Sequence, residues 1–142
     1  MPVLDFPIPK AAWAHEVGER DGGPLKPAEQ PAVDLRADAG PWWPAVQKIA
    51  DFQHLGDDWD GFGAKVPSRE LLETAIGLAY VFNQKGVDPA HRVVPGVDGT
   101  VIFEWQDPGG GYTEVEVVRP LYAEGMMIEP GKAPVHWTIP TE

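Results

Sequence analysis

The apolar residues of this chain change their spacing once, close to Pro89. Before that proline they recur every three or four positions, which is typical of one face of a helix. After it they alternate with polar residues, which is typical of a strand. Helices followed by strands favour an α+β fold over an alternating α/β fold. A chain of 142 residues suits a single domain of this kind.

Two helices are expected before Pro89. The first spans about residues 42–55, and its apolar positions share one face: Trp42, Ala45, Ile49 and Phe52. The second spans about residues 68–85, with Ser68 as its N-cap and Gly86 as the stop after its last turn. Both apolar stripes predict helices that pack against one core.

An antiparallel meander of four or five strands is expected after Pro89. Strands are expected to begin at residues 93–94 and to span 100–106, 112–119, 126–128 and 135–139, and residues 121–122 precede a turn at 123–125. A five-residue hairpin loop at 107–111 places Glu104 opposite Glu114 and Ile102 opposite Glu116, whereas a shift of two residues would pair Glu104 with Glu116. The two helices are expected to cover one face of this sheet.

Prolines are concentrated near the N-terminus, with eight of the 16 in residues 1–44. Each proline fixes its own φ angle, removes a hydrogen-bond donor and biases the preceding residue towards an extended conformation. The sequence therefore predicts a Pro-rich arm over residues 1–40, extended or partly flexible. A single α+β domain is expected over residues 41–142.

The chain is acidic, with 11 Lys and Arg against 22 Asp and Glu and a formal net charge of -11. A nucleic-acid partner is not expected, because phosphate binding needs a basic surface. A membrane partner is not expected either, since no apolar run approaches the ~20 residues of a span. The N-terminus has no signal-peptide pattern, which predicts a cytoplasmic protein. The oligomeric state stays open.

Three carboxylates and an indole cluster between the two predicted helices: Asp57, Asp58, Trp59 and Asp60. One interpretation is a structured turn, in which the Asp side chains cap backbone N–H groups while Trp59 and Phe62 pack inward. A second is a loop that contacts a protein or ligand, and a third is a site for a hard cation. The structured turn is favoured, because the spacing does not fit an EF-hand.

A second carboxylate group is predicted on the sheet, where Glu104, Glu114 and Glu116 share one face. This row can be a solvated outer face, an acidic patch for a basic partner or cation, or an acid–base pair. Trp42 is a further candidate for partner contact. It adjoins Trp43, and neighbouring helical side chains point about 100° apart, which leaves room for one indole to be exposed as an anchor.

Motifs for catalysis are missing from the sequence. There is no G-x-S-x-G, no P-loop and no closely spaced histidine pair, and Ser68, the only serine, is explained as a helix cap. With no cysteine, thiolate metal sites and a cysteine nucleophile are excluded. No metal or cofactor is therefore expected, and an enzyme is the less favoured class.

The run Asp58-Trp59-Asp60-Gly61-Phe62-Gly63-Ala64 is followed by Pro67-Ser68, a helix, an Asp98-Gly99 turn and a strand ending in Glu104-Trp105. This order resembles a family of small uncharacterised bacterial proteins with a W-D-G-aromatic-G-A motif between two helices. The resemblance covers roughly residues 45–118 and implies no catalytic residues. Its members resemble the stand-alone proteins of two-gene bacterial modules, which favours a partner-binding role.

Together these features favour a non-enzymatic acidic module that binds a basic partner protein, as an antitoxin, an immunity protein or an inhibitor would. The residues expected to contact the partner are Glu104, Glu114, Glu116, Asp57, Asp58, Trp59, Asp60 and Trp42. Two alternatives are a metal-assisted hydrolase that uses the clustered carboxylates and a structural subunit of a larger assembly.

Overall fold

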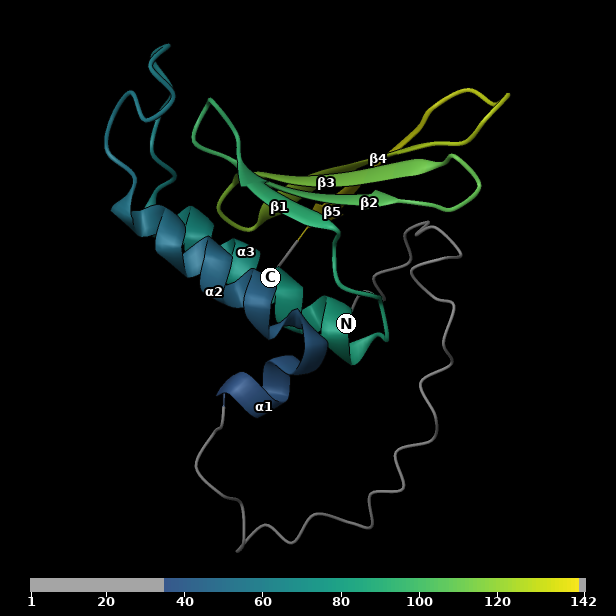
Figure 1. Ribbon diagram of the computed structural model, residues 1–142, viewed down its shortest axis with the longest axis horizontal. Coiled ribbons are helices and arrows are strands. Elements are labelled where there is room, and N and C mark those ends of the chain that lie inside the picture. Colours follow the sequence, from purple (N-terminus) through teal and green to yellow (C-terminus); the bar gives the residue numbers. More distant parts are fainter. Residues whose placement is uncertain (1–34, 141–142) are drawn as a thin grey trace, which may run out of the picture.

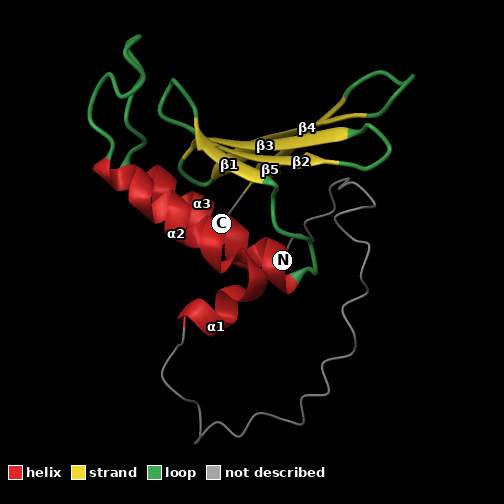
Figure 2. Ribbon diagram, viewed as in Figure 1, coloured by secondary structure: helices red, strands yellow, loops and turns green. Residues whose placement is uncertain are grey.

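A five-stranded antiparallel sheet packs on a layer of helices in the computed structural model of the protein, which describes residues 35–140 (Figures 1 and 2). The elements, with η for short 3-10 helices, are α1 Leu35–Ala39, η3 Gly40–Trp42, α2 Trp43–Asp51, η4 Phe52–His54, α3 Arg69–Gln84, β1 Arg92–Pro95, β2 Val101–Gln106, β3 Tyr112–Arg119, β4 Tyr122–Ile128 and β5 Val135–Pro140. Each strand pairs with its sequence neighbours, in the order β1-β2-β3-β4-β5. The predicted α+β fold with an antiparallel meander is confirmed.

Helix α3 has the ends that its sequence predicts. The Ser68 hydroxyl accepts a hydrogen bond from the backbone N–H of Leu71 at 3.1 Å, which makes it the N-cap. After the last turn Gly86 adopts a φ of +76°, and the N–H of Val87 donates to the carbonyl of Phe82 at 2.9 Å. This bond across a left-handed glycine is a Schellman ending, which satisfies carbonyls at the end of the helix.

The helical layer begins earlier than predicted. Residues Leu35–Ala39 form α1, so the expected arm is wrong for this stretch, while residues 1–34 lie outside the described part of the chain. No proline falls between Pro31 and Pro41, and Ala39 packs into the core with no exposed surface. Gly40, at a φ of +54°, then redirects the chain. The helix predicted over 42–55 is present as α2, flanked by η3 and η4.

Four aromatic rings fill the space between the helices and the sheet: Trp42, Phe82, Phe103 and Trp105. Their ring centroids lie 5.4–6.3 Å apart, in tilted, edge-to-face and stacked pairs. The indole N–H of Trp42 donates to the backbone carbonyl of Val87 at 2.8 Å, and that of Trp105 donates to the backbone carbonyl of Asp88 at 2.8 Å. Both indoles therefore fix the segment between α3 and β1 onto the core.

The register between β2 and β3 is the predicted one, with Glu104 opposite Glu114 and Ile102 opposite Glu116. The loop at 107–111 is closed by the N–H of Asp107, which donates to the carbonyl of Gly111 at 2.8 Å. This pairing sets which side chains share the outer face of the sheet, the face turned away from the helices (Figure 2).

Strand β4 is continuous from Tyr122 to Ile128, so the turn predicted at 123–125 is wrong. The chain turns at Pro120 and Leu121 instead, where Leu121 has a φ of +64°. Gly125, which suggested the turn, has another role: a Cβ at this position would clash with the Trp137 indole on β5. The glycine makes room for a side chain on the neighbouring strand.

Candidate partner-binding surface

Four glutamates lie on the outer face of the sheet, and we call them the acidic face: Glu104 on β2, Glu114 and Glu116 on β3, and Glu124 on β4. The alternation of each strand places them there, since the residues between them, such as Val115, are buried. Glu104 lies across from Glu114, and Glu116 lies across from Glu124. Sequence reasoning missed Glu124 because it assigned residues 123–125 to a turn.

The hydroxyl of Tyr112 lies between the paired carboxylates of Glu104 and Glu114. Its oxygen is 3.1 Å from Oε2 of Glu104 and 2.9 Å from Oε1 of Glu114. The hydroxyl has one hydrogen and therefore donates to one carboxylate at a time. Burial, then hydrogen bonding to Glu114 and its charge, then the same effects of Glu104, raise the pKa of Tyr112 above its ordinary value of 10.0. At neutral pH the phenol is neutral and can donate its hydrogen to either carboxylate.

Two further contacts orient the carboxylates. The hydroxyl of Thr100 donates to Oε2 of Glu116 at 2.7 Å, and Gly96 leaves space for it, because a Cβ there would clash with that hydroxyl. The guanidinium of Arg92 lies 3.6 Å from Oε1 of Glu104; the Arg92 side chain is 69% exposed and that of Glu104 is 19% exposed. Arg92 shows how a basic side chain can reach this face from solvent.

Apolar side chains share the outer face with the glutamates. Half-buried Ile102 lies across from Glu116, and half-buried Met126 lies across from Glu114. The surface therefore combines fixed carboxylates with apolar area, and both kinds of group can contact a protein partner.

Two aspartates of the interhelix loop, residues 56–66, accept hydrogen bonds from the loop's own backbone, and the third, Asp57, is exposed. Oδ1 of Asp58 accepts a hydrogen bond from the N–H of Gly63 at 2.5 Å. Oδ1 of Asp60 accepts from the N–H of Phe62 at 2.8 Å and from that of Ala64 at 3.0 Å. The interpretation as a turn capped by aspartates is confirmed. Asp58 itself has a φ of +60°, a conformation that Asp tolerates better than most residues.

The two aromatic residues of the loop differ in exposure. Trp59 is half-buried, and its indole N–H donates to the carbonyl of Lys65 at 2.9 Å. Phe62 is 93% exposed, so the prediction that it packs inward is wrong. Gly61 and Gly63, with φ angles of +80° and +89°, bend the backbone on both sides of it. Sequence reasoning overlooked this pair of flanking glycines as a sign of an outward side chain.

Trp42 does not belong to a surface site, because it has no exposed area and its ring lies in the aromatic core. Its role as an exposed anchor is therefore contradicted. Trp43, the other member of the pair, is half-buried and packs against the core. Neither indole of the pair is therefore exposed as an anchor.

The remaining predicted residues form two groups, the acidic face and the interhelix loop. The N–H of Lys65 donates to the carbonyl of Val97 at 2.8 Å, which joins the loop to the turn between β1 and β2. In Figure 1 the loop between α2 and α3 rises at this end of the sheet and extends past it on the side opposite the helices. The interhelix loop therefore extends to the side of the molecule on which the acidic face lies.

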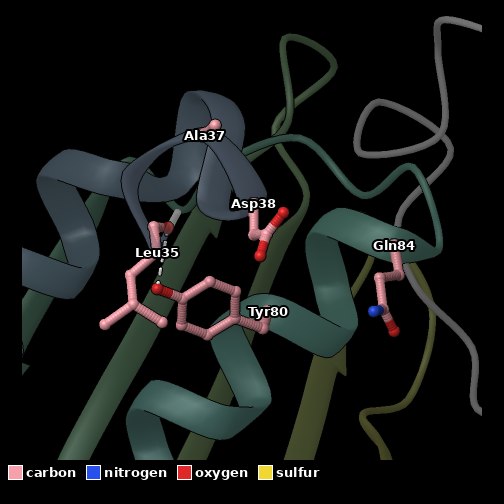
Figure 3. Close-up of a pocket in the computed structure, with 5 residues that line it drawn as sticks. All are labelled: Leu35, Ala37, Asp38, Tyr80 and Gln84. Carbon is pink, nitrogen blue, oxygen red and sulfur yellow. Dashed lines mark hydrogen bonds between the residues drawn. The ribbon is translucent and has the colours of Figure 1, made fainter. Parts of the chain in front are cut away.

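A pocket of about 440 Å³ lies on the helical side, lined by Leu35, Ala37, Asp38, Tyr80 and Gln84 (Figure 3). The hydroxyl of Tyr80 donates to the carbonyl of Leu35 at 2.9 Å across it. None of the predicted contact residues lines this pocket.

Within residues 35–140, no group of three or more histidine, aspartate or glutamate side chains is arranged to hold a metal ion.

No family model, curated protein or solved structure matches the chain. Among the helices of the described residues, none is both long and apolar enough to cross a membrane.

Proposed function

We propose that the protein binds a basic partner protein through the acidic face, in the non-catalytic manner of an antitoxin, an immunity protein or an inhibitor. The observation that carries this proposal is the pairing of like charges on the open face of the sheet: Glu104 with Glu114, and Glu116 with Glu124. Like charges directly opposite each other on a sheet destabilise it by a few tenths to about 1 kcal/mol.

A basic partner would remove this repulsion. Lysine and arginine side chains placed between the carboxylates would convert unfavourable pairs into favourable ones. Part of the binding free energy would then come from the loss of repulsion between the glutamates. Tyr112 and Thr100 already hold the carboxylates in position through their hydroxyls, so less side-chain entropy is lost on binding.

The negative charge of the whole chain also favours binding of a basic partner. A net charge of -11 attracts a basic protein over a distance of about 10 Å at 0.1 M salt, which raises the association rate. The acidic face would then orient the partner in the bound complex.

The test uses the purified full chain as bait in a lysate of its source organism at low salt. Any captured protein is then purified, and its Kd is measured at several salt concentrations. The variant Glu104→Gln/Glu114→Gln/Glu116→Gln is expected to raise the Kd at least tenfold and to flatten its salt dependence, since the partner's cations lose their counter-charges.

A matched control removes the same number of charges from the helical side, in the variant Asp51→Asn/Glu70→Gln/Glu73→Gln. All three control residues are exposed and lie on α2 or α3. The control is expected to keep the Kd of the unaltered protein. Equal Kd values for both variants would contradict the acidic face as the binding surface.

A further inference from the structure

Phe62 is the most exposed large apolar side chain in residues 35–140, at 93% exposure. A phenyl ring in water contributes nothing to the core. Burying such a ring is favourable, and folding leaves nearly all of that gain unused. A single exposed apolar ring in this loop is available to a second molecule.

The loop that carries Phe62 is held rigidly. The N–H groups of Phe62 and Ala64 both donate to the carboxylate of Asp60, and the N–H of Asp58 donates to the carbonyl of Ala64 at 2.9 Å. Ala64 is buried, and directly after it the N–H of Lys65 donates to the β1–β2 turn. The ring is therefore presented on a fixed backbone, and little loop entropy is lost when it binds.

The surroundings of the ring identify the kind of partner. Asp57, Asp58 and Asp60 outnumber Lys65 among the charged residues within five positions of Phe62, so an apolar pocket that accepts the ring meets net negative charge at its rim. An anionic lipid surface would repel them, and a second copy of this chain also carries a net charge of -11. A protein pocket rimmed by lysine or arginine satisfies both the ring and the charges.

We infer that Phe62 is the apolar anchor of the complex, inserted into an apolar pocket with a basic rim on the partner protein. This inference rests on the proposed function, because it adds a second contact to the same basic partner. The loop extends past the sheet on the side of the acidic face, so one partner can contact both (Figure 1). Anchor residues of this kind carry a large share of the binding free energy in protein interfaces.

The experiment measures the Kd of the captured and purified partner for four forms of the full chain. Phe62→Ser is expected to raise the Kd at least tenfold, whereas Phe62→Leu, which keeps an apolar side chain, is expected to raise it less. Leu35→Ser is the matched control, because Leu35 is 58% exposed and lies on α1, away from the loop. It is expected to leave the Kd unchanged. Equal thermal midpoints would show that all four forms are folded.

The outcomes separate this inference from the proposed function. If the triple glutamine variant raises the Kd but Phe62→Ser does not, the acidic face stands and the anchor is overturned. If neither changes the Kd, or the unaltered chain captures no partner, both are overturned. Phe62-dependent binding to phosphatidylglycerol vesicles, or a Phe62-dependent dimer mass in light scattering, would also overturn the inference in favour of a lipid surface or a second copy.

Discussion

At the scale of single residues, Tyr112 is the side chain that most affects the acidic face. Its hydroxyl lies within 3.1 Å of both Glu104 and Glu114, and its pKa is raised first by burial and then by these carboxylates. A deprotonated Tyr112 would place a third negative charge between two others. Ionisation of Tyr112 would therefore add repulsion to the acidic face.

This arrangement predicts an unusual alkaline titration. One tyrosine is expected to ionise well above pH 10, and Glu104→Gln/Glu114→Gln should lower its pKa, as measured by absorbance at 295 nm. The pKa of Tyr112 is higher in the folded than in the unfolded state. The contribution of its contacts to the free energy of unfolding is therefore complete below about pH 10, and it is lost as the pH rises through the folded-state pKa. Superimposable titration curves for the two proteins would contradict the contact.

Thr113 gives a second prediction at this scale. It is 1% exposed on the inner face of β3, and its hydroxyl has no hydrogen-bond partner among the described residues. Valine has nearly the same shape without the polar atom, so Thr113→Val is expected to raise the free energy of unfolding by about 1 kcal/mol. Chemical denaturation measures this, with Thr138→Val on the exposed outer face as the control. A loss of stability would show that the hydroxyl is satisfied.

At the scale of elements, glycine was the residue most easily misread from sequence. Gly86 ends α3 as expected, because an apolar helical stripe precedes it. Gly125 also looked like a turn, but it lies inside β4 under the Trp137 indole. A glycine that ends an element and a glycine that makes room for a neighbouring side chain differ only in what lies beside them. The sequence of one segment does not show which strand will lie next to it.

The role of Gly125 predicts a destabilising substitution. Gly125→Ala is expected to lower the free energy of unfolding by about 1–3 kcal/mol, because the new methyl group would force the Trp137 ring off β4. Thermal unfolding and the fluorescence of the indole would report the change. Gly109→Ala is the control, since a Cβ there has open space around it. A fully stable Gly125→Ala protein would show that the ring moves without cost.

At the scale of the whole molecule, the change in apolar spacing at Pro89 predicts helices followed by an antiparallel sheet, and the five-residue loop at 107–111 predicts the β2–β3 register. These depend on local periodicity, which the sequence contains. The exposure of Phe62 and the burial of Trp42 could not be predicted in this way. Both depend on the direction in which a rigid loop or a short helix enters the fold, and that direction is set by contacts between distant segments, such as Trp42 with Val87.

The distribution of charge over the two layers gives the last prediction. Neutralising Glu104, Glu114 and Glu116 to glutamine removes like-charge pairs and keeps the hydrogen-bond acceptors, but it also removes the ion pair of Glu104 with Arg92. Because Arg92 is 69% exposed, that ion pair contributes little, and the free energy of unfolding should rise by a few tenths to about 1 kcal/mol. The control Asp51→Asn/Glu70→Gln/Glu73→Gln should be neutral or slightly destabilising, because Glu70 lies in the first turn of α3 and Glu73 pairs with Arg69. Urea denaturation at low salt measures both. A gain in stability together with a loss of partner binding is the signature of a surface that gives up stability for function, whereas a loss of stability would mean that the repulsion on the acidic face is already compensated.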